Sequence, residues 1–312
     1  MEGQGKTAPL FWSSGDLLAD RRYGFAMDLA ARGDRQGAVH LLSQTLEMTP
    51  GFASAWFALG DLREQLGDRP GAIAAFQSAQ RTDPQDRQGA GLRLIRLGVE
   101  APDAMPSGYV RSLFDQYAPR FDAALESLAY RAPQLLLDAI KQVCHGRGQR
   151  LWFDAVLDLG CGTGLAGAAL RPFSDWLVGV DLSPAMIAKA GAKRFYDRLE
   201  VADIGTFMAA ERDATAQYHL ILAADVLPYV GDLGAIMAAA ASLLTTAGLF
   251  GFTLETHAGA GVVLGPKLRY AHSEAHVREA IAAAGLAVQS LLHASTRQEG
   301  GVPVPGLIVI AR

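Results

Sequence analysis

The stretch AVLDLGCGTGLAG, residues 155 to 167, holds the residue types and spacing that most clearly favour chemistry. An apolar run reaches Asp158 and then breaks into a turn that contains Gly160, Gly162 and Gly164. Glycines let a backbone approach a ligand where a Cβ would intervene, so this turn predicts a small-molecule site. A carboxylate just before the turn attracts a cation and repels a phosphate. The stretch therefore favours a positively charged ligand.

A rival interpretation of the same glycines is a nicotinamide dinucleotide site. Gly162, Gly164 and Gly167 satisfy G-x-G-x-x-G, a weak signal when it stands alone. The strand is expected to end just before Gly160, and a dinucleotide motif that opened there would have its third glycine at Leu165. The carboxylate before the turn would also lie close to a pyrophosphate. The position of the glycines relative to the end of the strand and the negative charge of Asp158 therefore both favour the cationic ligand.

Alternating strands and helices over residues 150–312 must position this turn. Short apolar runs such as WLVGVDLS and HLILAADVL are each followed by an alanine-rich helical stretch. This alternation predicts an α/β fold with a parallel sheet covered on both faces, and ligands bind at the carboxyl ends of such strands. The last two β-like pieces, AVQSLLHAST and GLIVIAR, have no helix between them and predict an antiparallel C-terminal hairpin.

Residues 150–312 resemble a class I S-adenosylmethionine-dependent methyltransferase, with several motifs in the family's order: VLDLGCGTG, LVGVDLS, LEVADIGTF and LILAADVLPYV. The resemblance implies a Rossmann-like sheet, S-adenosylmethionine as cofactor and S-adenosylhomocysteine as product. The positions that it implies for cofactor binding in this half are Asp158, Gly160, Cys161, Gly162, Gly164, Asp181, Leu182, Met186, Asp203, Ile204, Ala224 and Asp225.

The same resemblance implies a role for several of these positions. The turn from Gly160 to Gly164 would lie beneath the methionine part of the cofactor. Asp181 would accept the ribose hydroxyls, and Asp203 would meet the adenine amino group. Cys161 is expected to be a reduced packing residue whose backbone faces the ligand.

The segment FDQYAPRFD, residues 114–122, is similar to the F-D-x-x-A-x-x-Y-D segment that many small-molecule methyltransferases lay over the cofactor as a lid. Aromatic rings there would exclude water and place a ring face near the sulfonium. Phe121 stands where the family usually has tyrosine, so Tyr109 or Tyr117 could supply the missing hydroxyl. The alternative is that these rings only pack the helix onto the core.

The residues expected to contact the methyl acceptor belong to less specific motifs than those of the cofactor site. If the acceptor must lose a proton, the candidate catalytic residues are Asp225, Tyr229 and His257. A loop that contains Arg269 and Tyr270 could hold a substrate carboxylate, with Tyr229 beside it, or could be a surface turn. His272 and His276 have the spacing of a metal pair on a helix, but no third ligand is apparent, so no metal site is expected.

Residues 1–100 repeat at a shift of 34, which brings Gly33 onto Gly67 and Pro50 onto Pro84. The second copy strongly resembles a tetratricopeptide repeat, and the first has Arg22 where the tryptophan would be. We expect an all-α domain of two repeats with residues 86–98 as a capping helix. Linker and lid helices would follow over residues 101–149. The repeats could bind a protein or serve only packing or dimerisation.

Composition narrows the classes of protein. The chain has 312 residues, a net charge of -4 and two cysteines, and half its residues are apolar. We expect a reduced, cytoplasmic protein that binds neither nucleic acid nor membrane, because no basic face, secretory signal or long apolar run is evident. The main hypothesis is methyl transfer to an oxygen, nitrogen or carbon of a small molecule. The alternatives are a protein methyltransferase whose repeats recruit a polypeptide and a non-catalytic adaptor that binds S-adenosylmethionine.

Overall fold

The computed structural model describes residues 11–100 and 105–312. The chain forms two compact units, one ending at Leu113 and the other running from Phe114 to Arg312. The division falls inside helix α6 (Ser107–Tyr117). The limits expected for three domains, 1–100, 101–149 and 150–312, stay predictions. Residues 101–104, at the start of the expected linker, lie outside the described residues.

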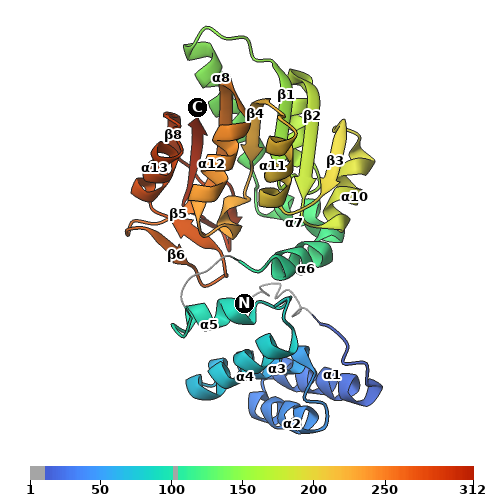
Figure 1. The fold of residues 1–312 in the computed structure, drawn as a ribbon. Helices are drawn as coiled ribbons and strands as arrows, with labels where there is room; N and C mark the ends of the chain where they lie inside the picture. The colour runs from blue at the N-terminus through green and yellow to red at the C-terminus, as the bar shows by residue number, and fades with distance from the viewer. Residues whose placement is uncertain (1–10, 101–104) are drawn as a thin grey trace. The chain divides into compact units, whose positions relative to one another are not determined.

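The first unit contains two helical hairpins, one for each copy of the repeat (Figure 1). Their helices are α1 (Leu17–Ala31), α2 (Arg35–Met48), α3 (Ala53–Gln65) and α4 (Arg69–Thr82). A Cβ on Gly60 would meet the Phe76 ring at 2.7 Å, so this glycine lets α3 and α4 approach closely. The expected helical repeat architecture is confirmed.

A fifth helix, α5 (Ala90–Arg96), packs on α4. Leu94 and Leu97 join Phe76 in one buried cluster. Arg93 Nη2 donates to Asp61 Oδ1 on α3 at 2.8 Å. The segment expected to cap the repeats thus forms a helix that covers the apolar face of the second repeat.

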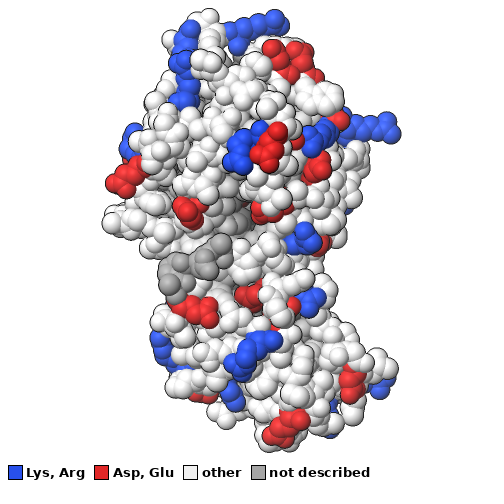
Figure 2. Space-filling model, in the orientation of Figure 1, with Lys and Arg blue, Asp and Glu red and all other residues white. Residues whose placement is uncertain are grey.

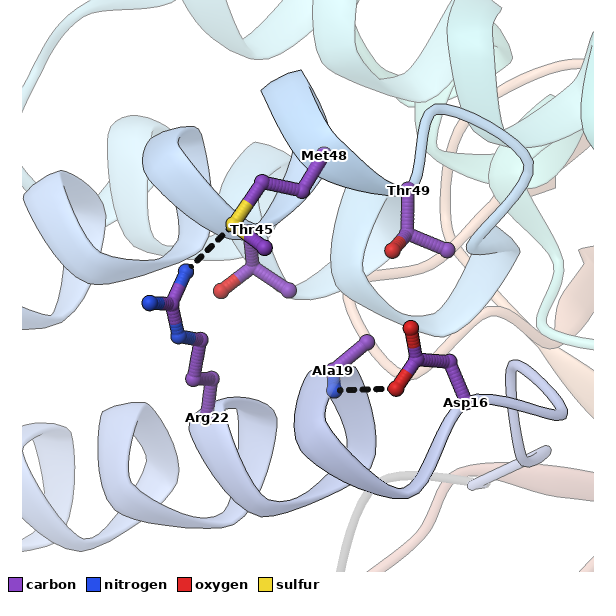
Figure 3. A pocket seen from close by; sticks show the side chains of 6 residues that line it. All are labelled: Asp16, Ala19, Arg22, Thr45, Met48 and Thr49. Carbon is purple, nitrogen blue, oxygen red and sulfur yellow. Dashed lines mark hydrogen bonds between the residues drawn. The ribbon is translucent and has the colours of Figure 1, made fainter.

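Arg22 replaces the tryptophan of the first repeat and lies beside a shallow hollow between α1 and α2 (Figure 3). Its Nη1 donates to Met48 Sδ at 2.6 Å, and Asp16 caps α1 by accepting from Ala19 N–H at 3.3 Å. In the second repeat, Trp56 packs against the clusters of both repeats. The arginine contacts α2 at a position where a tryptophan would have filled space.

The second unit is built on a sheet whose main path runs β3-β2-β1-β4-β5-β11-β8. Its strands are β1 (Phe153–Leu159), β2 (Ser174–Asp181), β3 (Arg198–Val201), β4 (Tyr218–Ala223), β5 (Leu244–Thr256), β8 (Val288–His293) and β11 (Gly306–Ala311). The first five strands pair in parallel, and β11 is antiparallel to both β5 and β8. The predicted parallel sheet with an antiparallel C-terminal hairpin is confirmed.

Helices cover both faces of this sheet (Figure 1). On one face, α11 (Ile204–Asp213), α12 (Leu233–Leu243) and α13 (Glu274–Ala283) pack into the larger buried cluster. On the other face, α8 (Ala132–Gly146) and α9 (Leu165–Leu170) form the second cluster. Helix α10 (Pro184–Lys193) packs on β2 and β3. Two buried faces explain why the strand sequences are nearly continuous apolar runs.

Four short strands were not predicted. They are β6 (Val262–Leu264), β7 (Tyr270–His272), β9 (Gln298–Glu299) and β10 (Val302–Pro303). Residues 270–272 were expected in a loop, and that expectation is wrong, because β7 pairs in parallel with β5 and antiparallel with β6. Ser273 then caps α13, and its Oγ accepts from His276 N–H at 3.3 Å.

Charged side chains of both signs are interspersed on the face drawn in Figure 2. None of the helices in the described ranges 11–100 and 105–312 has both the length and the apolar character that a membrane span needs.

Candidate active site

Asp158 lies near the carboxyl end of β1, in the centre of the parallel sheet, and only 1% of its surface is exposed. Its Oδ2 accepts from the Tyr196 hydroxyl at 2.6 Å, whereas Oδ1 is buried and has no hydrogen-bond partner in the described part of the chain. Burial raises the pKa of the Asp158 carboxyl to about 7, and the hydrogen bond from Tyr196 opposes that rise. An unpartnered buried acceptor at a strand end is a ready place for a cationic donor.

The glycine turn follows β1 as predicted, and Gly160, Gly162 and Gly164 all have positive φ, at 61°, 54° and 89°. Their missing side chains serve different purposes. A Cβ on Gly160 would collide with Val226, and one on Gly164 would meet the Tyr196 ring at 3.0 Å. A Cβ on Gly162 would meet only Phe121, at 3.8 Å. Of the three, Gly162 alone leaves open space for a ligand.

Cys161 is buried in this turn, with 5% of its surface exposed, and its thiol is free. Its N–H donates to Val180 O at 2.9 Å, which joins the turn to the neighbouring strand β2. Burial raises the pKa of the Cys161 thiol well above its usual range, so the side chain stays protonated.

Asp181 ends β2, the strand next to β1. Its Oδ2 accepts from Gly162 N–H at 2.9 Å and its Oδ1 from Ser183 N–H at 2.8 Å. The carboxylate therefore ties the glycine turn to the start of α10, and each oxygen keeps a lone pair for a further donor. Leu182 follows it in the loop, and Met186 is fully buried on α10.

Asp203 is the residue before α11, where β3 has ended. Its Oδ1 caps that helix by accepting from Gly205 N–H at 3.0 Å and Thr206 N–H at 3.1 Å. Ile204 begins the helix and packs against the larger buried cluster. The cap explains an aspartate here without any ligand, so its contact with adenine stays a prediction.

The segment 114–122 forms an aromatic group beside the glycine turn. The Phe121 ring lies 5.6 Å from Tyr117 and 6.2 Å from Phe114, and Phe114 lies 5.2 Å from Tyr229. All these pairs meet edge to face, the arrangement that aromatic quadrupoles favour. Tyr109 lies in the first unit, where a Cβ on Gly89 would meet its ring at 2.9 Å.

Two aspartates attach this segment to the loops after β1 and β2. Asp115 Oδ1 accepts from Ser183 Oγ–H at 2.5 Å and from Ala185 N–H at 3.2 Å. Asp122 accepts from Thr163 Oγ1–H in the glycine turn. Lys193 Nζ also donates to Asp122, at 2.7 Å. Sequence reasoning placed the rings and missed these anchors, although both aspartates belong to the motif FDQYAPRFD.

Asp225, proposed from sequence as a catalytic residue, follows β4, and both of its carboxylate oxygens accept hydrogen bonds. Its Oδ1 accepts from Thr253 Oγ1–H at 2.8 Å, and its Oδ2 accepts from Arg297 Nη1–H at 2.8 Å and Thr296 Oγ1–H at 3.2 Å. Both carboxylate oxygens are therefore occupied by donors of the fold, and the general-base role expected for Asp225 stays a prediction. Ala224 beside it packs against the α8 cluster.

Arg269 and Tyr270 are both engaged within the fold, and the substrate role expected for them stays a prediction. Arg269 Nε donates to Glu255 Oε1 at 2.5 Å and its Nη2 to Glu299 Oε1 at 2.5 Å. Tyr270 has no exposed surface and lies on β7. The guanidinium is already paired within the fold, and the tyrosine cannot reach solvent in this conformation.

His257 is held by its own loop. Its Nδ1 accepts from Gly259 N–H at 3.1 Å, and its Nε2 lies 3.2 Å from Gly261 O. Because a neutral histidine that accepts at Nδ1 donates at Nε2, both ring nitrogens are used. A base role for His257 therefore lacks support in the geometry, and Tyr229, beside Phe114, is the remaining acceptor-side candidate.

Three residues near these groups were missed. Tyr196 and Arg297 carry no local motif, and their partners lie 38 and 72 positions away. Tyr130 follows α7 (Phe121–Ser127), and burial together with the charge of Asp225 raises its pKa well above the usual range. Within residues 11–100 and 105–312, no three His, Cys, Asp or Glu side chains gather as a metal site would require.

Comparison with known proteins identifies the same two regions of the chain, the helical repeats and the sheet that carries the site. A family model described as a methyltransferase domain matches residues 157–250, and one described as a tetratricopeptide repeat matches residues 23–87. The chain joins tetratricopeptide repeats to a methyltransferase domain. The domain match begins at β1 and ends in β5, so it spans the carboxyl strand ends described above.

Curated relatives of the methyltransferase domain are similar over part of their length. The chain is 34% identical to human methyltransferase-like protein 27 over 139 residues, 44% of this chain and 56% of that protein. It is 32% identical to the ubiquinone biosynthesis O-methyltransferase of Rhodopseudomonas palustris (strain TIE-1) over 95 residues, 30% of this chain and 37% of that protein. The matches thus span about half or less of these relatives.

A solved structure shares the fold of the methyltransferase domain. It is magnesium protoporphyrin IX methyltransferase from Synechocystis PCC 6803 with bound S-adenosylhomocysteine. The TM-score is 0.50 at 19% identity, over 66% of this chain and 98% of that one.

Proposed function

We propose that the methyltransferase domain moves the methyl group of S-adenosylmethionine to a small-molecule acceptor. The observation that carries the proposal is the buried, unpartnered Oδ1 of Asp158, on the strand that leads into the turn where Gly162 leaves open space. S-adenosylmethionine carries an ammonium and a sulfonium and no phosphate, which suits a carboxylate in this position. A solved structure that shares this fold has S-adenosylhomocysteine bound, which supports the same cofactor.

Different residues of the chain would bind different parts of the cofactor. Asp158 would hold the ammonium, and Asp181 would accept the ribose hydroxyls with the lone pairs left by Gly162 and Ser183. Asp203 would meet the adenine amino group. Phe121 and Tyr117 would exclude water and offer ring faces to the sulfonium, a contact worth about 2 kcal/mol when it is desolvated.

The bound cofactor supplies an activated methyl group, so the protein mainly has to orient an acceptor in line with it. Such orientation can contribute roughly 7 to 11 kcal/mol. The atoms of Asp225 and His257 that could take a proton are engaged within the fold. This arrangement favours an acceptor whose attacking lone pair is free without a base, placed near Tyr229 and Phe114.

Isothermal titration of the full chain with S-adenosylmethionine and S-adenosylhomocysteine tests the cofactor. We expect binding of both, and Asp181→Ala should weaken binding at least about tenfold because a ribose acceptor and an anchor of the glycine turn are lost together. Absence of binding by the wild-type chain would overturn the proposal.

A second candidate is a protein methyltransferase, favoured by the tetratricopeptide repeats at residues 23–87. Repeats of this architecture present extended surfaces suited to polypeptides. The full chain can be incubated with methyl-labelled S-adenosylmethionine and a cell extract that is then separated by size. Label in the small-molecule fraction supports the first proposal, and label in protein supports the second. Bound cofactor with no transfer to either fraction would indicate the non-catalytic adaptor.

A further inference from the structure

Tyr196 occupies a slot made by three glycines from three parts of the methyltransferase domain. Cβ atoms on Gly164 and Gly179 would meet its ring at 3.0 Å and 2.8 Å, and one on Gly167 would collide with its hydroxyl end. Gly164 ends the glycine turn, Gly167 lies on α9 and Gly179 lies on β2. Ala190 of α10 lies near the same glycine turn. Side chains at the three glycine positions would displace the ring, so these glycines shape a place for one tyrosine.

The slot aims the Tyr196 hydroxyl at a single acceptor. It donates to Asp158 Oδ2 at 2.6 Å, and burial together with the charge of Asp158 raises the pKa of Tyr196 well above its usual range. The phenol therefore stays protonated and remains a donor. Because one carboxylate oxygen is held, the position of Oδ1 is also determined, and this oxygen is buried without a partner.

We propose that Tyr196 is a positioning residue that holds the Asp158 carboxylate so that Oδ1 meets the ammonium group of the cofactor. The inference rests on the proposed function, since it assigns a residue to the same cofactor site. Tyr196 touches no reacting atom in this scheme. It acts by orienting Asp158 and by stabilising its ionised form.

Because Asp158 must be ionised to attract an ammonium, the pH dependence of ligand affinity tests the proposal. The titratable groups that face it are Asp181, Cys161, Tyr130 and Tyr196. Burial and the charge of Asp181 raise the pKa of Asp158, and the hydrogen bond from Tyr196 lowers it, with a net value of about 7. Only the ionised carboxylate attracts an ammonium, so affinity for an amino-acid ligand should rise as pH increases toward 7 and then level off.

The experiment measures affinity by isothermal titration from pH 5.5 to 7.5, with wild type and Tyr196→Phe. The two probes are S-adenosylhomocysteine and 5′-methylthioadenosine, which keeps the nucleoside and lacks the amino acid. Tyr196→Phe keeps the ring in its slot and removes only the hydroxyl. We expect about tenfold weaker binding of S-adenosylhomocysteine at pH 6.5, because the variant loses the hydrogen bond that orients Asp158 and lowers its pKa. Affinity of the variant should still be rising at pH 7.5.

Binding of 5′-methylthioadenosine should change less than about twofold in the variant, since that probe has no ammonium to lose. Titration of Asp181 would affect both probes, so their difference isolates Asp158. Tyr218→Phe is a matched control, because the Tyr218 hydroxyl donates to the buried Glu211 at 2.5 Å near the opposite end of β4. This control should leave both affinities and the pH profile unchanged.

Equal losses for both probes, or an unchanged S-adenosylhomocysteine profile, would overturn the positioning role while leaving the proposed function intact. Failure of the wild-type chain to bind either probe would instead overturn the proposed function. If Tyr196→Phe does not fold, Asp158→Asn supplies a second test, since the amide keeps an acceptor for Tyr196 and carries no charge. Its S-adenosylhomocysteine affinity should be weak and independent of pH, and a rise with pH like that of the wild type would contradict the proposal.

Discussion

The Arg297 guanidinium donates to Asp225 Oδ2 at 2.8 Å, although the two residues are 72 positions apart. The same guanidinium pairs with Glu255, and its Nε donates to Glu299 Oε1 at 3.1 Å. One side chain thereby joins the ends of β4 and β5 to the β9 strand. This network lies where sequence reasoning had expected a base and a substrate-binding arginine.

Arg297→Met should destabilise the methyltransferase domain by about 1 to 3 kcal/mol, because it leaves the partly buried Asp225 carboxylate without its cation, whereas Glu255 and Glu299 keep Arg269. The Arg297 side chain is only 8% exposed. Chemical unfolding of the full chain, followed by a signal from the methyltransferase domain, measures the change. Lys267→Met is the control, since that side chain is 59% exposed, and it should shift stability by less than about 0.5 kcal/mol. Similar effects from both variants would contradict the assignment of Arg297.

Gly162→Ala should mainly weaken ligand binding, whereas Gly160→Ala should mainly destabilise the fold. At Gly162 an alanine meets only Phe121 and incurs the strain of positive φ, about 1 to 2 kcal/mol. At Gly160 an alanine has similar strain and also collides with Val226. We expect Gly162→Ala to lose at least about tenfold in S-adenosylhomocysteine affinity with a small drop in melting temperature. Gly160→Ala should show the larger drop in melting temperature, and the reverse order would count against the open space at Gly162.

Cys161→Ala should leave cofactor affinity within about twofold of the wild type, whereas Asp158→Ala should abolish most of it. The cysteine is buried and contributes its backbone N–H to the fold, which alanine retains. Titration with S-adenosylhomocysteine compares the two variants, and thermal melting verifies that both are folded. A large loss of affinity in Cys161→Ala would show that the thiol itself takes part in binding.

Asp158→Asn should make the protein more stable at high pH. The folded pKa of about 7 lies above the usual 3.8, so the ionised carboxylate is disfavoured in the folded state. Stability contributed by this group is present at low pH and is lost as pH rises from about 4 to 7. The variant should exceed wild type by up to about 4 kcal/mol at pH 8 and match it near pH 4. Unfolding midpoints at both pH values measure this, and a constant difference would contradict the raised pKa.

The sequence alone determined the features that depend on local pattern. Apolar runs of strand length followed by glycine or acid predicted β1, β2 and the turn between β1 and α9, and the 34-residue shift predicted the helical repeats. Parallel strands in sequence order also imply that Asp158 and Asp181 end at one edge of the sheet. These inferences need only short-range periodicity and the chemistry of glycine.

Tertiary structure decided which groups are free to meet a ligand. From sequence, Arg269 was a plausible carboxylate binder, but folding brings Glu255 and Glu299 to it from 14 and 30 positions away. Gly164 was expected only from its place in the glycine turn, and the fold adds that its missing side chain leaves room for the Tyr196 ring. A side chain's charge can be read from the sequence. Whether that charge is already paired depends on residues that only the fold brings together, because ion pairing and close packing act over ångströms and not along the chain.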